Sequence, residues 1–139
     1  MIHIFLDSSI IIESIKKNEE ALKILKYIYI KLENIQLYIN PIVWSEVTYQ
    51  LVIKRKFDSN KIYEMLDNFN ILKIDQNSID ISKKLINQYN LYTNDSLNIA
   101  SAVQFNINIF CSLDNDFLEV THKENIFLIN NLQKIQSII

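Results

Sequence analysis

The chain has 139 residues, 49% of them hydrophobic, a formal net charge of −2 and no glycine. This length and apolar content predict a single domain over residues 1–139 with a buried core, which argues against a disordered protein. The charge offers nucleic acid no general electrostatic attraction, and the absence of glycine excludes glycine-rich phosphate loops and dinucleotide-binding fingerprints.

Short apolar runs alternate with helical patterns along the chain. Five apolar runs predict strands at residues 2–6, 36–39, 71–74, 107–113 and 126–129. Helical spacing predicts helices at residues 9–15, 21–32, 41–53, 60–69, 78–89 and 95–105, and in the C-terminal segment. Strands separated by helices imply βαβ units, so the pattern predicts an α/β fold with a mainly parallel sheet of roughly five strands.

Polar residues mark the expected ends of these helices. Side-chain caps are expected from Ser8 or Ser9, Asn40, Asp58 or Ser59, and Thr93 and Asn94. Pro41 suits the first position of its helix, because the N–H that it lacks would have no partner there. Asn90 and Asn106 stand where helices end, and each is expected to adopt the left-handed conformation that glycine usually provides.

The cysteine content and the N-terminus indicate a cellular compartment. The single cysteine, Cys111, excludes an internal disulfide and fits a reducing cytoplasm, and its apolar neighbours Ile109 and Phe110 predict a thiol buried in a strand. The N-terminal residues lack the basic segment of a signal peptide and reach Asp7 early, and no apolar stretch approaches ~18 residues. We therefore expect a cytoplasmic protein without a leader or a membrane segment.

Four short acidic segments are the most informative feature of the chain. They read Phe5-Leu6-Asp7-Ser8-Ser9, Trp44-Ser45-Glu46-Val47, Asn94-Asp95-Ser96-Leu97 and Ser112-Leu113-Asp114-Asn115-Asp116. Ligands of parallel sheets bind beyond the carboxyl ends of the strands, and Asp7 and Asp114 directly follow predicted strands. Crowded carboxylates repel one another and a divalent cation relieves this repulsion, so the pattern predicts an acidic pocket for Mg²⁺ or Mn²⁺ rather than for zinc.

Each acid also has an ordinary structural interpretation. Asp7 can cap a helix, Glu46 can lie on a helix surface, and Asp95 can interact with the positive end of its helix. Asp114 and Asp116 can shape an Asx turn. None of these interpretations explains why the acids share the binding edge of the predicted sheet.

The basic and histidine residues give weaker signals. The cluster Lys54-Arg55-Lys56 ends the third predicted helix, where it can be a solvated helix end or can contact the phosphate backbone of a nucleic acid. His3 is expected in or beside the first strand and His122 in a polar turn. The two histidines are not spaced like metal ligands.

The chain resembles the PIN-domain ribonucleases, and among them the small VapC-like toxins of type II toxin–antitoxin systems. The resemblance rests on the order of the acidic segments, with the second extended as Pro41-Ile42-Val43-Trp44-Ser45-Glu46-Val47, the third through Asn98-Ile99-Ala100-Ser101-Ala102 and the fourth to Phe117. It implies a three-layer α/β/α arrangement and a divalent-metal-dependent endoribonuclease that cleaves single-stranded RNA.

The resemblance also assigns roles to individual residues. It implies a catalytic quartet of Asp7, Glu46, Asp95 and Asp114. It implies metal ligands at Asp7, Asp95, Asp114 and Asp116. Ser8 and Ser112 would hold a carboxylate or a water near the metal, and Ser112 stands where the family usually has threonine. Glu46 would complete the ligand set or orient the attacking water, and in-line attack would leave a 5′-phosphate.

Two other functions stay open. A catalytically inactive PIN-like protein would keep the fold and act as an RNA-binding or scaffold protein. A phospho-receiver domain also places aspartates at strand ends. A receiver would have an acidic pair after its first strand and a lysine after its last, whereas serines follow Asp7 and Asn130-Asn131 follows the last predicted strand.

Besides an RNA substrate, an antitoxin and a second copy of the chain are expected partners. An antitoxin segment is expected near Lys16, Tyr49 and Ile53. It would direct an arginine toward Asp7 and Asp95, because the planar guanidinium binds carboxylates through two parallel hydrogen bonds. A homodimer is expected because the helices carry many apolar side chains, including Tyr27, Tyr29, Tyr63 and Phe69.

Overall fold

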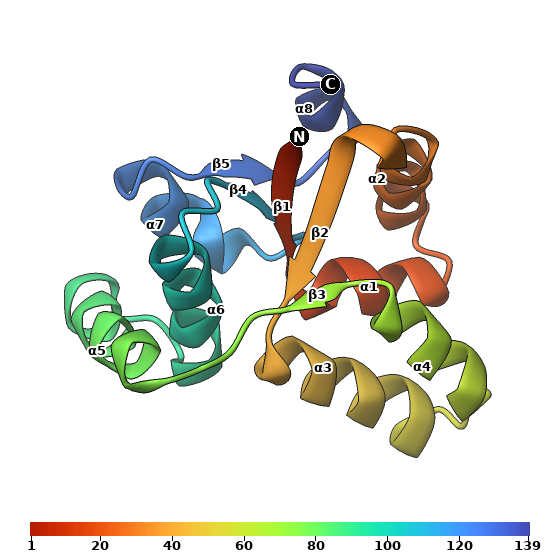
Figure 1. Ribbon diagram of the computed structural model, residues 1–139, viewed down its shortest axis with the longest axis horizontal. Helices are drawn as coiled ribbons and strands as arrows, with labels where there is room; N and C mark the ends of the chain where they lie inside the picture. The colour runs from red at the N-terminus through yellow and green to blue at the C-terminus, as the bar shows by residue number, and fades with distance from the viewer.

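The computed structural model describes all residues 1–139 and contains a five-stranded parallel sheet flanked by helices (Figure 1). The strands are β1 (Ile2–Leu6), β2 (Ile35–Ile39), β3 (Asn70–Ile71), β4 (Ile109–Cys111) and β5 (Phe127–Ile129). Their order in the sheet is β3-β2-β1-β4-β5, and every neighbouring pair is parallel. The predicted fold class is confirmed.

Helices cover both sides of this sheet. They are α1 (Ser8–Ile15), α2 (Glu19–Ile30), α3 (Pro41–Thr48), α4 (Ser59–Asp67), α5 (Gln76–Tyr89), α6 (Thr93–Gln104), α7 (Leu118–Lys123) and α8 (Leu132–Gln136). Figure 1 shows α5, α6 and α7 on one side of strands β1 and β2, and α1, α2 and α4 on the other. Each helix is either too short or too polar to cross a membrane.

The strand order places a topological switch point between β1 and β4. The chain leaves β1 toward β2 on one side, whereas it reaches β4 from the helices on the other side. Loops that follow two such strands diverge, and the crevice between them is where open α/β sheets bind ligands. The first and fourth acidic segments follow β1 and β4, so the topology brings them to this crevice.

Several predicted helix boundaries are confirmed. The Asn40 side chain accepts a hydrogen bond from the Val43 N–H at 2.9 Å, and Pro41 is the first residue of α3. Asn90 and Asn106 adopt the left-handed conformation, with φ of 56° and 57°. The other left-handed residues are Lys17, Lys56 and Asn125. In a chain without glycine, asparagine therefore takes three of the five left-handed positions.

Other boundaries were predicted wrongly. Helix α6 begins at Thr93, so neither Thr93 nor Asn94 is its cap. Ser8 and Ser9 lie inside α1, because the Asp7 N–H still pairs with the Cys111 carbonyl at 2.9 Å and the helix starts directly after it. His122 lies in α7 rather than in a turn.

The edge strand and the helix after α3 also differ from prediction. Strand β3 has two residues rather than four, because the chain turns away from the sheet toward the start of α5. The helix predicted over residues 41–53 is α3 followed by a π-helical segment, η2 (Tyr49–Lys54). Two 3₁₀ turns, η1 (Leu32–Asn34) and η3 (Asn115–Phe117), were not predicted.

One continuous apolar core supports the sheet. Its centre is aromatic, with the ring centroids of Phe5 and Phe110 5.2 Å apart and those of Phe110 and Phe117 4.8 Å apart. Cys111 is fully buried in β4 as predicted, and burial raises the pKa of its thiol. Phe69 is also buried, so it is not among the exposed apolar residues expected to promote dimerisation.

Candidate active site

The first acid, Asp7, lies buried at the end of β1, with 5% of its surface exposed. It occupies the N-cap position of α1, yet its side chain accepts no capping hydrogen bond from that helix. Its Oδ2 instead accepts hydrogen bonds from the hydroxyls of Ser9 and Ser112, both at 2.8 Å. The carboxylate is therefore held both by Ser112 in the loop after β4 and by the hydroxyl of Ser9 in the first turn of α1.

The two serines fasten the first turn of α1 to the loop after β4. Ser112 is fully buried, and its Oγ accepts a hydrogen bond from the Asp114 N–H at 3.0 Å. The Oγ of Ser9 accepts one from the Leu113 N–H at 3.2 Å and lies 3.2 Å from the Oγ of Ser112. This network sets the position of Asp114 relative to Asp7.

A buried amide chain reaches Asp7 from the other side. The Asn98 side chain, on α6, donates to Asp7 Oδ1 at 3.2 Å. The Asn98 Oδ1 accepts from the Asn40 side chain at 3.0 Å, and Asn40 also donates to the Ser101 hydroxyl at 2.9 Å. Because Asn40 also caps α3, the same chain of hydrogen bonds connects Asp7 to the start of the helix that carries Glu46.

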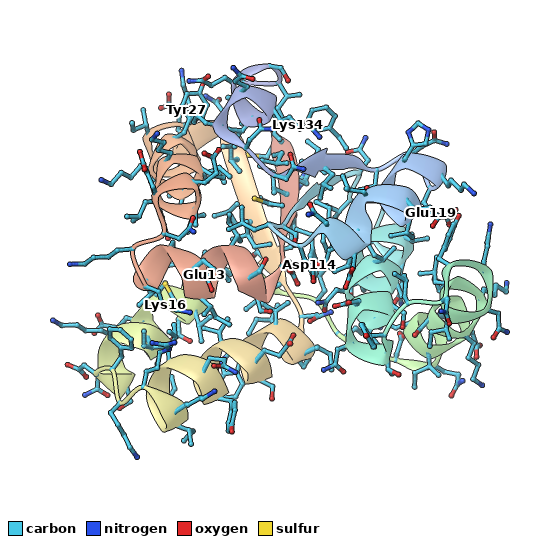
Figure 2. The ribbon with its side chains drawn as sticks, turned by 180° about the vertical axis from the view of Figure 1, so that it is seen from behind. Glu13, Lys16, Tyr27, Asp114, Glu119 and Lys134 are labelled. Carbon is cyan, nitrogen blue, oxygen red and sulfur yellow. The ribbon has the colours of Figure 1, made fainter.

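Three other acids lie close to one another, and the negative charge of Asp7 acts on one of them, Asp95. One carboxylate oxygen from each of Asp95, Asp114 and Asp116 lies within 4.8 Å of the other two. Asp95 comes from the first turn of α6, and the other two come from the turn after β4, where Asp114 accepts a hydrogen bond from the Asp116 N–H at 2.9 Å. Figure 2 shows Asp114 where the start of α1 meets the helices on the other side of the sheet.

Glu46 borders this group from α3. The Ser8 hydroxyl donates to Glu46 Oε1 at 3.4 Å, which connects the start of α1 to the middle of α3. Burial raises the pKa of Glu46, and the negative charge of Asp7 raises it further. Ser8 therefore contacts one of the acids that were predicted to be catalytic.

The electrostatics of the group favour a bound cation. Burial and the charges of Asp7, Asp114, Asp116 and Glu46 raise the pKa of Asp95 from 3.8 to about 7. Burial raises the pKa of Asp7 as well, although hydrogen bonds from Ser112 and Ser9 oppose that shift. None of the five acids forms an ion pair with a lysine, an arginine or a histidine. The site thus holds crowded carboxylates without a cationic side chain to neutralise them.

Two cavities border the acids. One, of about 360 Å³, lies between the end of α5 and the start of α6 and is lined by Tyr89, Asn90, Leu91, Tyr92, Asp95 and Asp116. The other, of about 440 Å³, lies between α1 and α3 and includes Ser8, Lys16, Glu46 and Tyr49. In Figure 2, Glu13 and Lys16 lie along α1 on the side of this second cavity, and the two form an ion pair at 3.3 Å.

The remaining predicted site residues lie elsewhere. Lys54, Arg55 and Lys56 are exposed at the end of η2, and none of them lines either cavity beside the acids. His3 lies in β1, where its Nδ1 is 2.8 Å from the Tyr38 hydroxyl, and His122 is exposed on α7. The structure places neither histidine among the acids.

Ser9, Asn40 and Asn98 were not predicted as site residues. Asn98 carries a signal in the sequence, because it lies three residues after Asp95 and beside the apolar Ile99 and Ala100, on the buried face of α6. A polar residue on such a face needs a buried partner, and here that partner is Asp7. Asn40 was recognised only as a helix cap.

The arrangement as a whole is known from other proteins. The model of the PIN domain family matches residues 4–123. The chain is 33% identical to Ribonuclease VapC2 of Methanocaldococcus jannaschii in an alignment that covers 87% of this chain and 91% of that protein. It is 30% identical to Ribonuclease VapC6 of the same organism, with coverage of 85% and 92%.

Solved structures show the same fold. VapBC2 from Rickettsia felis, bound to a DNA fragment from the promoter, matches with a TM-score of 0.72 at 19% identity, over 92% of this chain and 98% of that one. A toxin–antitoxin complex from Klebsiella pneumoniae matches with a TM-score of 0.67 at 24% identity, over 82% and 89%. Together with the family match and the identity to two ribonucleases named VapC, these likenesses establish that the chain belongs to the PIN-domain family, in its VapC branch.

Proposed function

We propose that this protein is a divalent-metal-dependent endoribonuclease that cleaves single-stranded RNA, and that it acts as the toxin of a toxin–antitoxin pair. The observation that carries the proposal is the group of Asp95, Asp114 and Asp116, whose carboxylate oxygens lie within 4.8 Å of one another without a cationic partner. Membership of the VapC branch supports the same chemistry, since two relatives of this chain are named as ribonucleases.

The donor atoms fit a hard divalent cation. All are carboxylate oxygens, which suit Mg²⁺ or Mn²⁺ and not zinc. Asp95, Asp114 and Asp116 would hold the ion, with Asp7 behind them. Side-chain hydrogen bonds from Ser9, Asn98 and Ser112 would fix the Asp7 carboxylate beside this group.

Each group around the scissile phosphate would have a separate role in hydrolysis. A bound Mg²⁺ or Mn²⁺ lowers the pKa of water and neutralises developing charge on phosphate oxygens. Glu46, whose pKa is raised, would orient the attacking water and accept its proton. The water oxygen would form a bond to phosphorus while the bond from phosphorus to the 3′ oxygen breaks. The departing 3′ oxygen would take a proton from solvent, so the products would be a 5′-phosphate and a 3′-hydroxyl. Ser112 and Ser9 keep Asp7 and the loop of Asp114 in place.

Cleavage of RNA by the purified protein tests this function. After treatment with chelator, wild type is expected to cleave single-stranded RNA only when Mg²⁺ or Mn²⁺ is restored, and Glu46→Gln and Asp95→Asn are expected to be inactive. Glu119→Gln is the matched control, since Glu119 is an exposed acid on neighbouring α7 (Figure 2) that pairs with Lys123 at 3.3 Å. A folded wild type that cleaves none of a varied set of RNAs would indicate the inactive RNA-binding or scaffold alternative.

A second readout reports the metal itself. An Mn²⁺ site that forms only in the folded state should stabilise wild type by about 2.7 kcal/mol when Mn²⁺ is about 100-fold above its Kd. Thermal unfolding with and without Mn²⁺ measures this gain. Asp114→Asn should lose most of it, whereas Glu119→Gln should keep it. Equal gains in wild type and Asp114→Asn would place the metal elsewhere.

An antitoxin is the proposed inhibitor. Support comes from the cavity between α1 and α3, which includes Lys16 and Tyr49 and opens toward Glu46. Tyr49 and Ile53 are 55% and 56% exposed on the adjoining η2, so an apolar peptide would find partners there. An arginine from that peptide would reach the acids and take the place of the cation. Displacement of Mn²⁺ by the partner encoded beside this gene is the corresponding measurement.

A cytoplasmic homodimer completes the proposal. The end of α2 and the turn that follows it expose Tyr29, Ile30 and Leu32 at 46%, 76% and 42%, and exposed apolar patches commonly mark interfaces. Light scattering at high micromolar concentration should give the mass of two chains. Ile30→Lys should shift that mass toward the monomer, and a wild-type monomer mass would contradict the dimer.

A further inference from the structure

We propose that the cavity between α5 and α6 is a nucleobase subsite, in which Tyr92 stacks on a base of the RNA adjacent to the cleaved phosphate. The inference rests on the proposed function and names the part of the chain that holds the substrate. It concerns Tyr92 and the connection from Asn90 to Tyr92, which do not belong to the acidic group.

The backbone presents Tyr92 at the mouth of the cavity. Asn90 ends α5 in the left-handed conformation and turns the chain outward, so that α5 and α6 pack side by side with a three-residue connection between them. Tyr92 then takes the extended N-cap position of α6, with φ −62° and ψ 150°. Its side chain is 77% exposed, the largest exposure of any large hydrophobic residue in the chain.

This exposure is not explained by packing. The neighbouring Tyr89 is held in place, since its hydroxyl donates to Glu124 Oε2 at 2.9 Å and its ring packs against the core. Tyr92 is absent from the core contacts and makes no aromatic pair. The cavity thus has one fixed aromatic wall and one free aromatic ring, which is the arrangement that proteins use to stack unpaired bases.

The negative charges of the acids in the cavity wall favour a base over a phosphate as the occupant. Asp95 and Asp116 line the same cavity, so an occupant lies in contact with two of the three carboxylates in the metal group. Carboxylates in the wall repel a phosphate, whereas an uncharged base can donate hydrogen bonds from its amino groups to them or to the Asn90 side chain. A base in the cavity would leave its phosphate beside the metal group, where cleavage is proposed.

Three variants test the role of the Tyr92 ring in the Mn²⁺-loaded protein. Tyr92→Ala should lower kcat/KM on single-stranded RNA by about 5-fold to about 150-fold, the range expected for loss of one stacked base. Tyr92→Trp, which keeps a stacking surface, should stay within about 3-fold of wild type. Phe57→Ala is the control, because Phe57 is an exposed aromatic residue that lines neither cavity beside the acids.

RNA with one abasic nucleotide locates the contact. If Tyr92 stacks on a base, one position next to the cleavage site should be sensitive to an abasic nucleotide. At that position the abasic RNA should lower the kcat/KM of wild type by the same factor as Tyr92→Ala lowers kcat/KM on intact RNA. Tyr92→Ala acting on the abasic RNA should then lower kcat/KM no further than either change alone. Additive losses at every position, or equal kcat/KM for Tyr92→Ala and wild type, would overturn the subsite.

Binding without cleavage separates this inference from the proposed function. Dye-labelled RNA should bind Glu46→Gln, and anisotropy should show a weaker affinity when Tyr92→Ala is added. If wild type cleaves nothing but RNA binding still depends on Tyr92, the nuclease function fails and the subsite stands. If RNA binding is unchanged by Tyr92→Ala while binding of a protein partner is weakened, the cavity is a protein-docking site and the proposal is wrong.

Discussion

Asp7 and Asp75 both stand at helix N-cap positions, Asp7 before α1 and Asp75 before α5. Asp75 caps its helix: its Oδ1 accepts from the Ser78 N–H at 3.2 Å, and the Ser78 hydroxyl accepts from the Asp75 N–H at 3.0 Å. Gln104 also donates to it at 2.9 Å, and these hydrogen bonds, with that from Gln104 foremost, lower the pKa of Asp75. Asp7 caps nothing, and burial raises its pKa.

The difference lies in where the hydrogen-bond donors come from. The backbone donor to Asp75 is in its own helix, so this aspartate stabilises local structure. The donors to Asp7 include Asn98 and Ser112, which lie 91 and 105 residues away in the chain. An aspartate that does not cap its own helix and is held largely by distant elements, beside other acids, is positioned for a ligand rather than for its helix.

The largest expected effect is on catalysis. Asp7→Asn keeps the size of the side chain but removes a charge from the acidic group, so kcat/KM on RNA should fall by at least about 100-fold. Asp75→Ala, at the equivalent helix position, should retain wild-type activity at a temperature where it is folded. Parallel cleavage assays compare the two variants. Similar losses of activity in both would show that the effect of Asp7→Asn is structural rather than catalytic.

The amide chain behind Asp7 should matter somewhat less. Asn98→Ala removes the donor to Asp7 Oδ1, so Mn²⁺ affinity and kcat/KM should each fall by about 10-fold to 100-fold. Asn98→His, which can supply an N–H at the same position, should recover part of the Mn²⁺ affinity. The control is Asn87→Ala, on the exposed face of α5. Unchanged Mn²⁺ affinity in Asn98→Ala would remove Asn98 from the site.

Metal-free stability should depend on pH through Asp95. Its folded pKa of about 7 is above the ordinary 3.8, so the fold favours the neutral acid, and this contribution to stability is lost as pH rises through 7. The shift corresponds to roughly 4 kcal/mol. Because Asp95 is only half-buried, solvent screening reduces the expected loss between pH 5 and pH 8 to roughly 1–2 kcal/mol.

Denaturant unfolding in chelator at pH 5 and pH 8 measures that loss. Asp95→Asn cannot ionise, so it should be the more stable protein at pH 8 and should show a smaller difference between the two pH values. Asp75 does not contribute in this window, since its lowered pKa keeps it ionised in both states. A metal-free wild type that gains stability from pH 5 to pH 8 would contradict the predicted repulsion.

The smallest expected effect is the loss of the α5 cap. Asp75→Ala leaves the Ser78 N–H without its acceptor and should lower Tm by roughly 4 °C, with or without Mn²⁺. Asp7→Asn should behave differently, because it weakens the binding of Mn²⁺ and so loses most of the Tm increase that Mn²⁺ produces. A Tm change in Asp75→Ala that depends on Mn²⁺ would couple that aspartate to the metal group.

Local patterns in the sequence were sufficient for most of the architecture. Apolar runs separated by helical spacing predicted a mainly parallel sheet of roughly five strands, and Asn40, Pro41, Asn90 and Asn106 marked helix ends correctly. These signals involve residues within a few positions of one another, so they can be read without knowing the fold. The short β3 was misjudged because its length depends on pairing with β2.

The sequence by itself also determined which acids are available and in what order, since they follow strands or begin helices. Only the tertiary structure decided that Asp95, Asp114 and Asp116 form the close group. Asp7 lies outside that group and accepts hydrogen bonds from Asn98, Ser9 and Ser112. The physical reason is that a side chain's surroundings depend on which strands are neighbours. The order β2-β1-β4 brings together segments about a hundred residues apart, and their burial raises the pKa of Asp7 while Asp75, of the same residue type at the same helix position, remains an ordinary cap.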